Sequence, residues 1–206
     1  MSTLGSIRGL ADCYRLRTVS IVPSARGGIE AGLRAPSVLA LSPLERPDPG
    51  LVAAACEAGA LGVLDRGRNA TRAQHALDIL GGRVAAFGVR VPDGSLDLEL
   101  PPAAAVVIVG SPAEVARFSS RLVLAQVTSL DEARAAILAG AAGLVAKGCE
   151  AGGRVGDETT FVLVQHLVAE LRVPVWAQGG IGLHTAAACL AGGAAGVVLD
   201  TQLALL

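Results

Sequence analysis

The sequence predicts an α/β protein, and within that class a (β/α)8 TIM barrel in a minimal or C-terminally truncated form. Eight short apolar runs alternate with helical segments along the 206 residues. Three of the helix-to-strand transitions repeat one pattern: AGALGVLD at 58–65, AGAAGLVAKG at 139–148 and AGGAAGVVLD at 191–200. Polar and glycine-rich residues follow the later runs, which is where a barrel places its site.

Each repeat is typical of a helix end followed by a buried strand. A glycine just past a helix adopts the left-handed conformation without a steric penalty. The apolar run that follows does not alternate with polar residues, as expected for a parallel strand that is buried on both faces. Coincidence in a chain rich in alanine and glycine is the alternative interpretation.

The elements are expected in strict alternation. The predicted strands span 37–42, 61–65, 84–89, 105–109, 122–127, 143–147, 173–178 and 196–200. Helices are predicted from 48, over 68–80, from Ser111, from Ser129, over 159–171 and over 183–193. Ser111 with Glu114, and Ser129 with Glu132, match the S-x-x-E capping box of a helix start.

The barrel is expected to form one domain over residues 36–206, after an N-terminal extension of unclear structure over 1–35. The chain ends in TQLALL, which is too short for a full eighth helix and suggests a piece of a larger polypeptide. An open doubly wound sheet is the alternative fold. It would carry its glycine fingerprint after the first strand, where this chain has SPLERPDPG.

Composition excludes several classes of partner. The net charge is −1 and no basic cluster exceeds a residue or two, so nucleic acid is not expected. The longest apolar runs fall short of the roughly 20 residues that span a bilayer, and no signal peptide precedes them. Four cysteines without C-x-x-C spacing predict neither a metal site nor a disulfide framework. We therefore expect a cytoplasmic protein.

The candidate site lies at the carboxyl ends of the strands, where polar residues accumulate. Gln126, Lys147 and Gln178 end three strands, and Asp200–Thr201 follow the last one. QGGIG at 178–182 leads into a helix, whose backbone N–H groups could cradle a phosphate beside Gly179 and Gly180. A tight turn that needs no ligand is the alternative.

The stretch KGCEAGGRVGDETT at 147–160 gathers flexible and charged residues after the sixth predicted strand. Its glycines would let it fold over the barrel, where Lys147 could offset a phosphate or a reduced flavin, or simply reach solvent. Cys149 has no adjacent histidine base, so a cysteine nucleophile is not expected. Asp157 and Glu158 are interpreted as first-turn acids of the next helix. His184 opens the seventh helix beside the cradle, whereas His75 and His166 are expected on helix surfaces.

Residues 122–206, from LVLAQVTSLDEARAA through VPVWAQGGIGLHTAAACLAGG to the end, closely resemble the nitronate monooxygenase family, once called 2-nitropropane dioxygenases. The variant they are most similar to is a domain of modular polyketide synthases. Residues 36–65 are similar to the opening of that family. FMN-dependent enoyl reductases are related barrels. The resemblance implies bound FMN, with its phosphate on Gly179–Gly180 and the Asp200–Thr201 turn, and with Gln126, Lys147 and Gln178 near the isoalloxazine.

Two positions depart from the family pattern. The loop GCEAGGR keeps Glu150, Gly152 and Gly153, but Arg154 stands where the family has its catalytic histidine. Arginine cannot release its proton near neutral pH. Arg154 and Glu150 are therefore the candidate catalytic residues, for a reaction other than proton abstraction. After the last strand, Asp200 precedes Thr201 where the family usually has glycine.

These features predict an FMN-dependent oxidoreductase acting on a small nitronate or, within a synthase, on an unsaturated acyl thioester beside other synthase domains. The alternative is a non-catalytic barrel module of such a synthase. A phosphate-ester lyase or isomerase is a third hypothesis, but it lacks paired acid and base residues at the strand ends.

Overall fold

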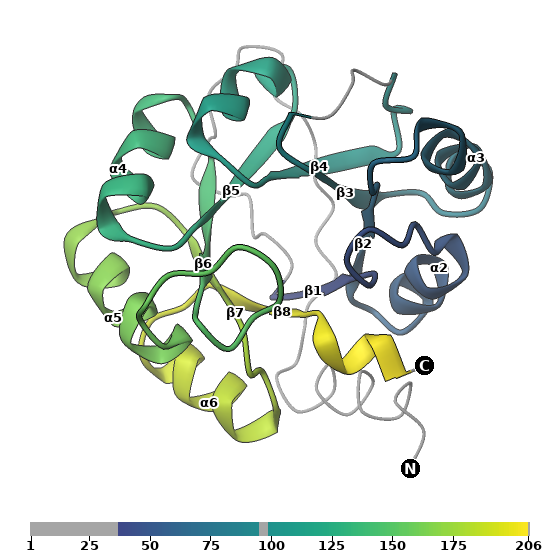
Figure 1. The fold of residues 1–206 in the computed structure, drawn as a ribbon. Helices are drawn as coiled ribbons and strands as arrows, with labels where there is room; N and C mark the ends of the chain where they lie inside the picture. Colours follow the sequence, from purple (N-terminus) through teal and green to yellow (C-terminus); the bar gives the residue numbers. More distant parts are fainter. Residues whose placement is uncertain (1–36, 95–98, 206) are drawn as a thin grey trace.

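The computed structural model describes residues 37–94 and 99–205, which form a ring of parallel strands surrounded by helices (Figure 1). In this part of the chain, eight strands close into a barrel in chain order, with β8 pairing back onto β1. The predicted (β/α)8 barrel is confirmed. The predicted N-terminal extension, 1–35, lies outside the described residues.

The elements have the following bounds. The strands are β1 Val38–Leu41, β2 Leu61–Asp65, β3 Phe87–Val91, β4 Ala104–Val109, β5 Leu122–Val127, β6 Gly143–Lys147, β7 Val175–Gln178 and β8 Gly196–Leu199. The α-helices are α2 Pro49–Glu57, α3 Ala70–Gly81, α4 Leu130–Leu138, α5 Thr160–Glu170 and α6 Leu183–Ala191. Two 3-10 helices complete the described part, η1 Pro112–Phe118 and η2 Thr201–Leu205.

The third strand lies later than the predicted 84–89. The backbone N–H groups of Arg83 and Val84 both donate to the carbonyl of Leu80, so these residues belong to the turn that ends α3. At its other end the strand continues through Arg90, which pairs in register with Ile108 of β4. The predicted strand ended at Val89, but the backbone stays in the sheet through Arg90 and Val91 while the Arg90 guanidinium lies at the barrel mouth.

The two predicted capping boxes form only in part. Ser129 Oγ accepts from the Glu132 N–H at 3.2 Å, as predicted, but the Glu132 carboxylate accepts from the N–H of Thr128 instead of returning to Ser129. Ser111 opens a 3-10 helix and accepts from Ala113 at 3.3 Å. Glu114 pairs with Arg117.

The barrel interior is filled by side chains that alternate along the strands, as the period of two requires. Trp176 of β7 is the largest of them and is 1% exposed. The ring fits because Gly143 and Gly196 on the neighbouring strands have no side chains, and a Cβ on either would lie within 3.0 Å of the indole. The other interior residues are Leu39, Leu41, Leu61, Val63, Val106, Ile108, Leu124, Val145 and Val198.

A second apolar cluster of small aliphatic residues joins the strands to the surrounding helices. No helix within 37–94 and 99–205 is long and apolar enough to cross a membrane. Over the same ranges, no group of three or more His, Cys, Asp or Glu side chains is placed to hold a metal ion.

Candidate active site at the carboxyl ends of the strands

A polar layer covers the apolar interior at one end of the barrel. Two residues beyond an interior side chain, each of five strands carries a polar residue on the same inward face. These are Asp65 after Val63, Gln126 after Leu124, Lys147 after Val145, Gln178 after Trp176 and Asp200 after Val198. All five are buried. The alternation that builds the core therefore also delivers these groups to one place.

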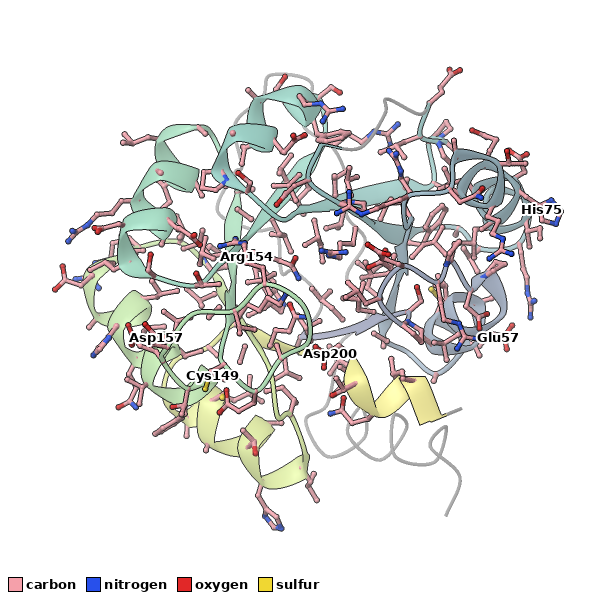
Figure 2. The ribbon with its side chains drawn as sticks, viewed as in Figure 1. Glu57, His75, Cys149, Arg154, Asp157 and Asp200 are labelled. Atoms are coloured by element: carbon pink, nitrogen blue, oxygen red, sulfur yellow. The ribbon has the colours of Figure 1, made fainter. Side chains whose placement is uncertain are left out.

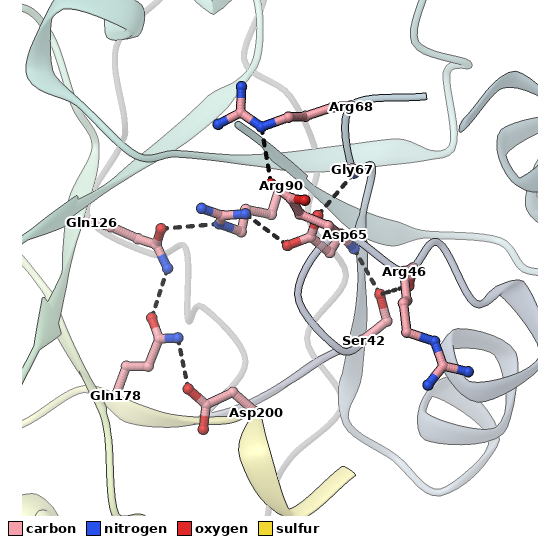
Figure 3. A network of polar contacts seen from close by, with 10 residues as sticks. Ser42, Arg46, Asp65, Gly67, Arg68, Arg90, Gln126, Gln178 and Asp200 are labelled. Carbon is pink, nitrogen blue, oxygen red and sulfur yellow. Dashed lines mark hydrogen bonds and ion pairs between the residues drawn. The ribbon is translucent and has the colours of Figure 1, made fainter. Parts of the chain in front are cut away.

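Four hydrogen bonds link this layer across the barrel from β2 to β8 (Figure 3). Arg90 donates from Nη1 to Asp65 Oδ2 at 2.7 Å and from Nε to Gln126 Oε1 at 3.1 Å. Gln126 Nε2 donates to Gln178 Oε1 at 2.7 Å, and Gln178 Nε2 donates to Asp200 Oδ2 at 2.9 Å. Each side-chain amide uses both its oxygen and its nitrogen, which fixes its orientation.

The Asp65 end of this network is fully satisfied. Its second oxygen, Oδ1, accepts from the Gly67 N–H at 2.8 Å, and its own N–H donates to Ser42 Oγ at 2.8 Å. A buried carboxylate without such partners would cost several kcal/mol or would become protonated. Asp65 and Arg90 therefore form a structural ion pair that anchors one side of the barrel mouth.

Lys147 is the only lysine of the chain, and it is 4% exposed. No hydrogen bond or ion pair joins its Nζ to any residue in the described part of the chain. Burial, together with the nearby charges of Arg90 and Arg154, lowers the pKa of Lys147 to about 8, against a smaller opposing effect of Asp200 and Asp65. A buried cation without a partner would gain from an anionic or electron-rich ligand.

The loop between β6 and α5 lies across the end of the barrel (Figure 1). Gly153 has a left-handed φ of 79°, and a Cβ there would lie 3.5 Å from Lys147 Nζ. Gly148, at the start of the loop, packs so closely on α5 that a Cβ would lie 2.2 Å from the Thr160 N–H nitrogen. The predicted folding of this loop over the barrel mouth is in keeping with these contacts, whereas Gly152 contacts nothing through its Cβ position.

Glu150 caps helix α5. Its Oε2 accepts from the backbone N–H of Thr160 at 2.9 Å and from the Thr160 hydroxyl at 3.0 Å. The side chain of the N-cap residue, Thr159, makes no capping bond, so Glu150 takes that part. Although burial alone would raise the pKa of Glu150, the hydrogen bonds from Thr160 lower it. Its predicted catalytic role stays a prediction.

Arg154 ties the same loop to the segments that follow the nearby strands β4 and β5. Its Nη1 donates to Glu132 Oε1 at 2.6 Å, and its Nη2 donates to the carbonyl of Gly110 at 2.7 Å. Burial alone would raise the pKa of Glu132, but bonds from the Thr128 backbone and from Arg154 lower it, so the pair is ionised at neutral pH. Arg154 therefore serves at least as a clamp for the loop.

The turn after β7 is built from two left-handed glycines for different reasons. Gly179 has φ 120°, and a Cβ there would lie 2.6 Å from Thr160 Oγ1. Gly180 has φ 59°, but its Cβ would meet only the Glu150 side chain, at 3.5 Å. Packing thus requires glycine at 179, whereas backbone conformation alone favours it at 180.

The turn after β8 is occupied by its own aspartate. Asp200 Oδ1 accepts from the Thr201 N–H at 2.6 Å and lies 3.2 Å from the Thr201 hydroxyl. The Gln202 side chain accepts from the Asp200 N–H at 3.2 Å and donates to the carbonyl of Ile181 in the preceding turn.

Among the other residues singled out from the sequence, Cys149, Asp157 and His75 lie away from this centre (Figure 2). Cys149, Asp157, His75 and His184 are exposed. Asp157 and Glu158 precede α5 and are not in its first turn, contrary to the prediction, and the Glu158 carboxylate pairs with His166 Nδ1 at 2.7 Å instead.

Sequence comparison assigns the chain to a family. The profile of the nitronate monooxygenases matches residues 88–206, which is more than half of the chain. The chain belongs to the nitronate monooxygenase family. No curated protein matches it in a sequence search.

Solved structures agree with this assignment. FabK from Thermotoga maritima is 29% identical with a TM-score of 0.68, over 79% of this chain and 58% of that one. A nitroalkane oxidase from Streptomyces ansochromogenes is 25% identical with a TM-score of 0.67, over 80% and 65%. A protein described as native KDPGal, 18% identical with a TM-score of 0.56, shares the fold. The chain spans less than two thirds of the length of FabK and of the oxidase.

The structure thus joins three predicted site residues, Gln126, Gln178 and Asp200, in one hydrogen-bonded chain, with Lys147 in the same layer. Sequence reasoning missed Asp65 and Arg90 in this layer. Counting inward positions by twos along β2 and β3 would have found both, but the third strand was placed too early for Arg90 to fall on it.

Proposed function

We propose that the chain is a flavin-dependent oxidoreductase whose isoalloxazine would lie across the strand ends, against Gln126, Lys147 and Gln178. The observation that carries this proposal is Lys147, a buried cation that lies beneath a glycine-rich loop and has no ion-pair or hydrogen-bond partner within residues 37–94 and 99–205. Such a group fits a ring system that becomes anionic on reduction. Family membership supports the same reading.

The residues fit FMN unevenly. The lysine end of the site fits a flavin ring, and Gly179–Gly180 offer a turn beside the start of α6 for a phosphate, as the family resemblance implies. Gly152 and Gly153 would let the loop above approach the ring. Asp200 and Thr201 do not fit, because the N–H and the hydroxyl of Thr201 are bonded to the Asp200 carboxylate.

A bound flavin would supply the hydride chemistry, and the protein supplies orientation and charge. Lys147 would offset negative charge on the ring. Arg154 cannot serve as a base, but its charge could stabilise an anionic or enolate-like substrate. We therefore propose hydride transfer to the β-carbon of an activated acyl group, such as an unsaturated acyl thioester, rather than proton abstraction from a nitroalkane. A nicotinamide-type donor would supply this hydride through the flavin, and a solvent proton would complete the α-carbon. The resemblance of residues 122–206 to synthase domains supports a polyketide synthase setting in the cytoplasm, alongside other domains.

A non-catalytic barrel is the second candidate. Two observations favour it: Arg154 is already bonded to Glu132 and Gly110, and Asp200 fills its own turn. A structural module needs no free group at the barrel mouth. The non-catalytic barrel gives no reason for a buried lysine at position 147.

Flavin titration separates the two candidates. We expect the purified protein to quench the fluorescence of added FMN or riboflavin. For whichever flavin binds more tightly, Lys147→Met should raise the dissociation constant about tenfold or more, equivalent to ~1.4 kcal/mol. Arg172→Met removes one exposed cation away from the barrel mouth and should leave flavin binding unchanged. A protein that binds neither flavin would be the non-catalytic barrel.

A further inference from the structure

The turn after β8 holds an internal anion. Both carboxylate oxygens of Asp200 are engaged, Oδ1 by the N–H and hydroxyl of Thr201 and Oδ2 by Gln178 Nε2 at 2.9 Å. The side chain is buried, with the residue 9% exposed. The donors that a barrel usually offers to a ligand phosphate in the loops after strands seven and eight are, on this side, taken by the chain itself.

Gln202 reinforces this arrangement by joining the two turns. Its side-chain oxygen accepts from the Asp200 N–H at 3.2 Å, and its side-chain nitrogen donates to the carbonyl of Ile181, in the turn after β7. A phosphate between the turns would have to displace these bonds. It would also bring a second negative charge beside a carboxylate in a partly desolvated place, where like charges repel more strongly than in water.

Asp200 is also held in place from inside the barrel. Gln178 donates to it, Gln126 donates to Gln178, and Arg90 donates to Gln126. Rotating Asp200 away would leave the amide of Gln178 buried without an acceptor, which is unfavourable. The carboxylate is therefore a fixed part of the site.

We propose that the Asp200 carboxylate occupies the position of the cofactor phosphate, so that the site takes a flavin without a phosphate group in preference to FMN. This inference rests on the proposed function, because it specifies the ligand of the same site. It assigns Asp200 the role of a specificity residue that selects against phosphorylated flavins by charge and by taking their hydrogen-bond donors.

The test compares FMN and riboflavin as probes of the same 206-residue chain. Dissociation constants are measured by fluorescence quenching for the unaltered chain, Asp200→Asn, Asp200→Gly and Asp131→Asn. Asp200→Asn removes the charge at nearly constant shape, and Asp200→Gly also frees the N–H and hydroxyl of Thr201. Asp131 is 96% exposed in its side chain on α4, so its change to Asn is the matched control for net charge.

We expect the unaltered chain to bind riboflavin at least as tightly as FMN. In both Asp200 variants the ratio of the FMN to the riboflavin dissociation constant should fall about tenfold, a ratio in which any shared effect on Gln178 cancels, and Asp131→Asn should leave this ratio unchanged. If circular dichroism shows that a variant does not fold, the comparison of the two flavins on the unaltered chain still tests the proposal. Tighter binding of FMN than of riboflavin by the unaltered chain would overturn this inference alone. Binding of neither flavin would overturn the proposed function together with it.

Discussion

Lys147 loses hydration at the barrel mouth, and no residue in the described part of the chain forms an ion pair with it in return. Its pKa is about 8 in the folded chain and 10.5 when unperturbed, so between these values the unfolded chain binds more protons. Stability must therefore rise with pH across that window, and the burial cost of the ammonium is fully present below it. Because solvent at the barrel mouth screens part of this effect, we expect the free energy of unfolding to rise by about 1–2 kcal/mol across the window. This is less than the full pKa shift of Lys147 implies.

The check is urea unfolding of the unaltered chain and of Lys147→Met between pH 7 and 10.5, without flavin. Taking the difference between the two proteins cancels the other groups that titrate there, including Cys56 and Cys189, whose thiol pKa values burial raises. Lys147→Met should be the more stable protein at pH 7, and its advantage should vanish by about pH 10.5. An advantage that is independent of pH would show that the lysine is well solvated.

Arg154 offers a second prediction at the scale of one residue. In place of a base, it is a cation bonded to Glu132 and to the carbonyl of Gly110. We expect no oxidation of nitronates or nitroalkanes by the unaltered protein loaded with flavin. Arg154→His should restore some turnover, measured as oxygen consumption, because an imidazole can accept a proton near neutral pH. Arg154→Gln, which also breaks the ion pair but adds no base, should remain inactive. Robust nitronate oxidation by the unaltered protein would mean that another residue is the base.

At the scale of the elements, helix α5 is stabilised by Glu150, a residue that the sequence predicted to be catalytic. Glu150 supplies the cap that Thr159 does not, by accepting from the N–H and hydroxyl of Thr160. Replacing a capping side chain by alanine costs about 1 kcal/mol. We predict that Glu150→Ala loses about this much stability at pH 7, measured by urea unfolding. Asp157→Ala in the same loop should lose little.

The pH dependence of this effect has a definite sign. The pKa of Glu150 is lowered in the folded chain, so the stability it contributes is present above the unfolded value of about 4.5 and is lost as the pH falls through the folded value. The difference between the unaltered chain and Glu150→Ala should therefore shrink on acidification. An equal difference at pH 7 and pH 3 would show that the loss comes from the loop's packing and not from the carboxylate.

Sequence patterns were sufficient for most elements and failed at their ends. The runs 61–65 and 143–147 are apolar up to their last residue, because both faces of the strand are buried, and each ends in a charged residue at the barrel mouth. Their predicted bounds agree with β2 and β6. The third strand was predicted too early because Val84 begins the apolar run. In the structure the N–H of Val84 bonds to the carbonyl of Leu80, so this residue belongs to the turn that ends α3. Hydrogen bonds between residues far apart in the chain, such as the bond from Arg90 to Gln126, leave no local pattern in the sequence. The sequence therefore predicted that polar residues gather at the barrel mouth, but not which of them bond to one another.

For the whole molecule, barrel closure depends on a tight contact between the first and last strands. Gly196 of β8 lies beside Ser37 and the indole of Trp176, and a Cβ there would be 2.4 Å from the Ser37 carbonyl oxygen and 2.6 Å from Trp176 Nε1. Neither neighbour can move cheaply, because one is backbone hydrogen-bonded to Val197 and the other fills the barrel interior. The repeat AGGAAGVVLD predicted a glycine at the start of a strand. It did not predict that this glycine makes room for the indole ring of Trp176 on the neighbouring strand β7.

We therefore predict that Gly196→Ala destabilises the barrel by about 3 kcal/mol, at the upper end of what overpacking usually costs. Trp176 is the only tryptophan of the chain, so its fluorescence reports unfolding of the interior directly. Gly152→Ala is the matched control, because a Cβ at 152 meets nothing within 4 Å. The midpoint of urea unfolding should fall sharply for the first variant and stay close to that of the unaltered chain for the second. Equal midpoints for all three proteins would mean that the strands can part at the β1–β8 seam without loss, and that the closed barrel is not what holds Trp176 in place.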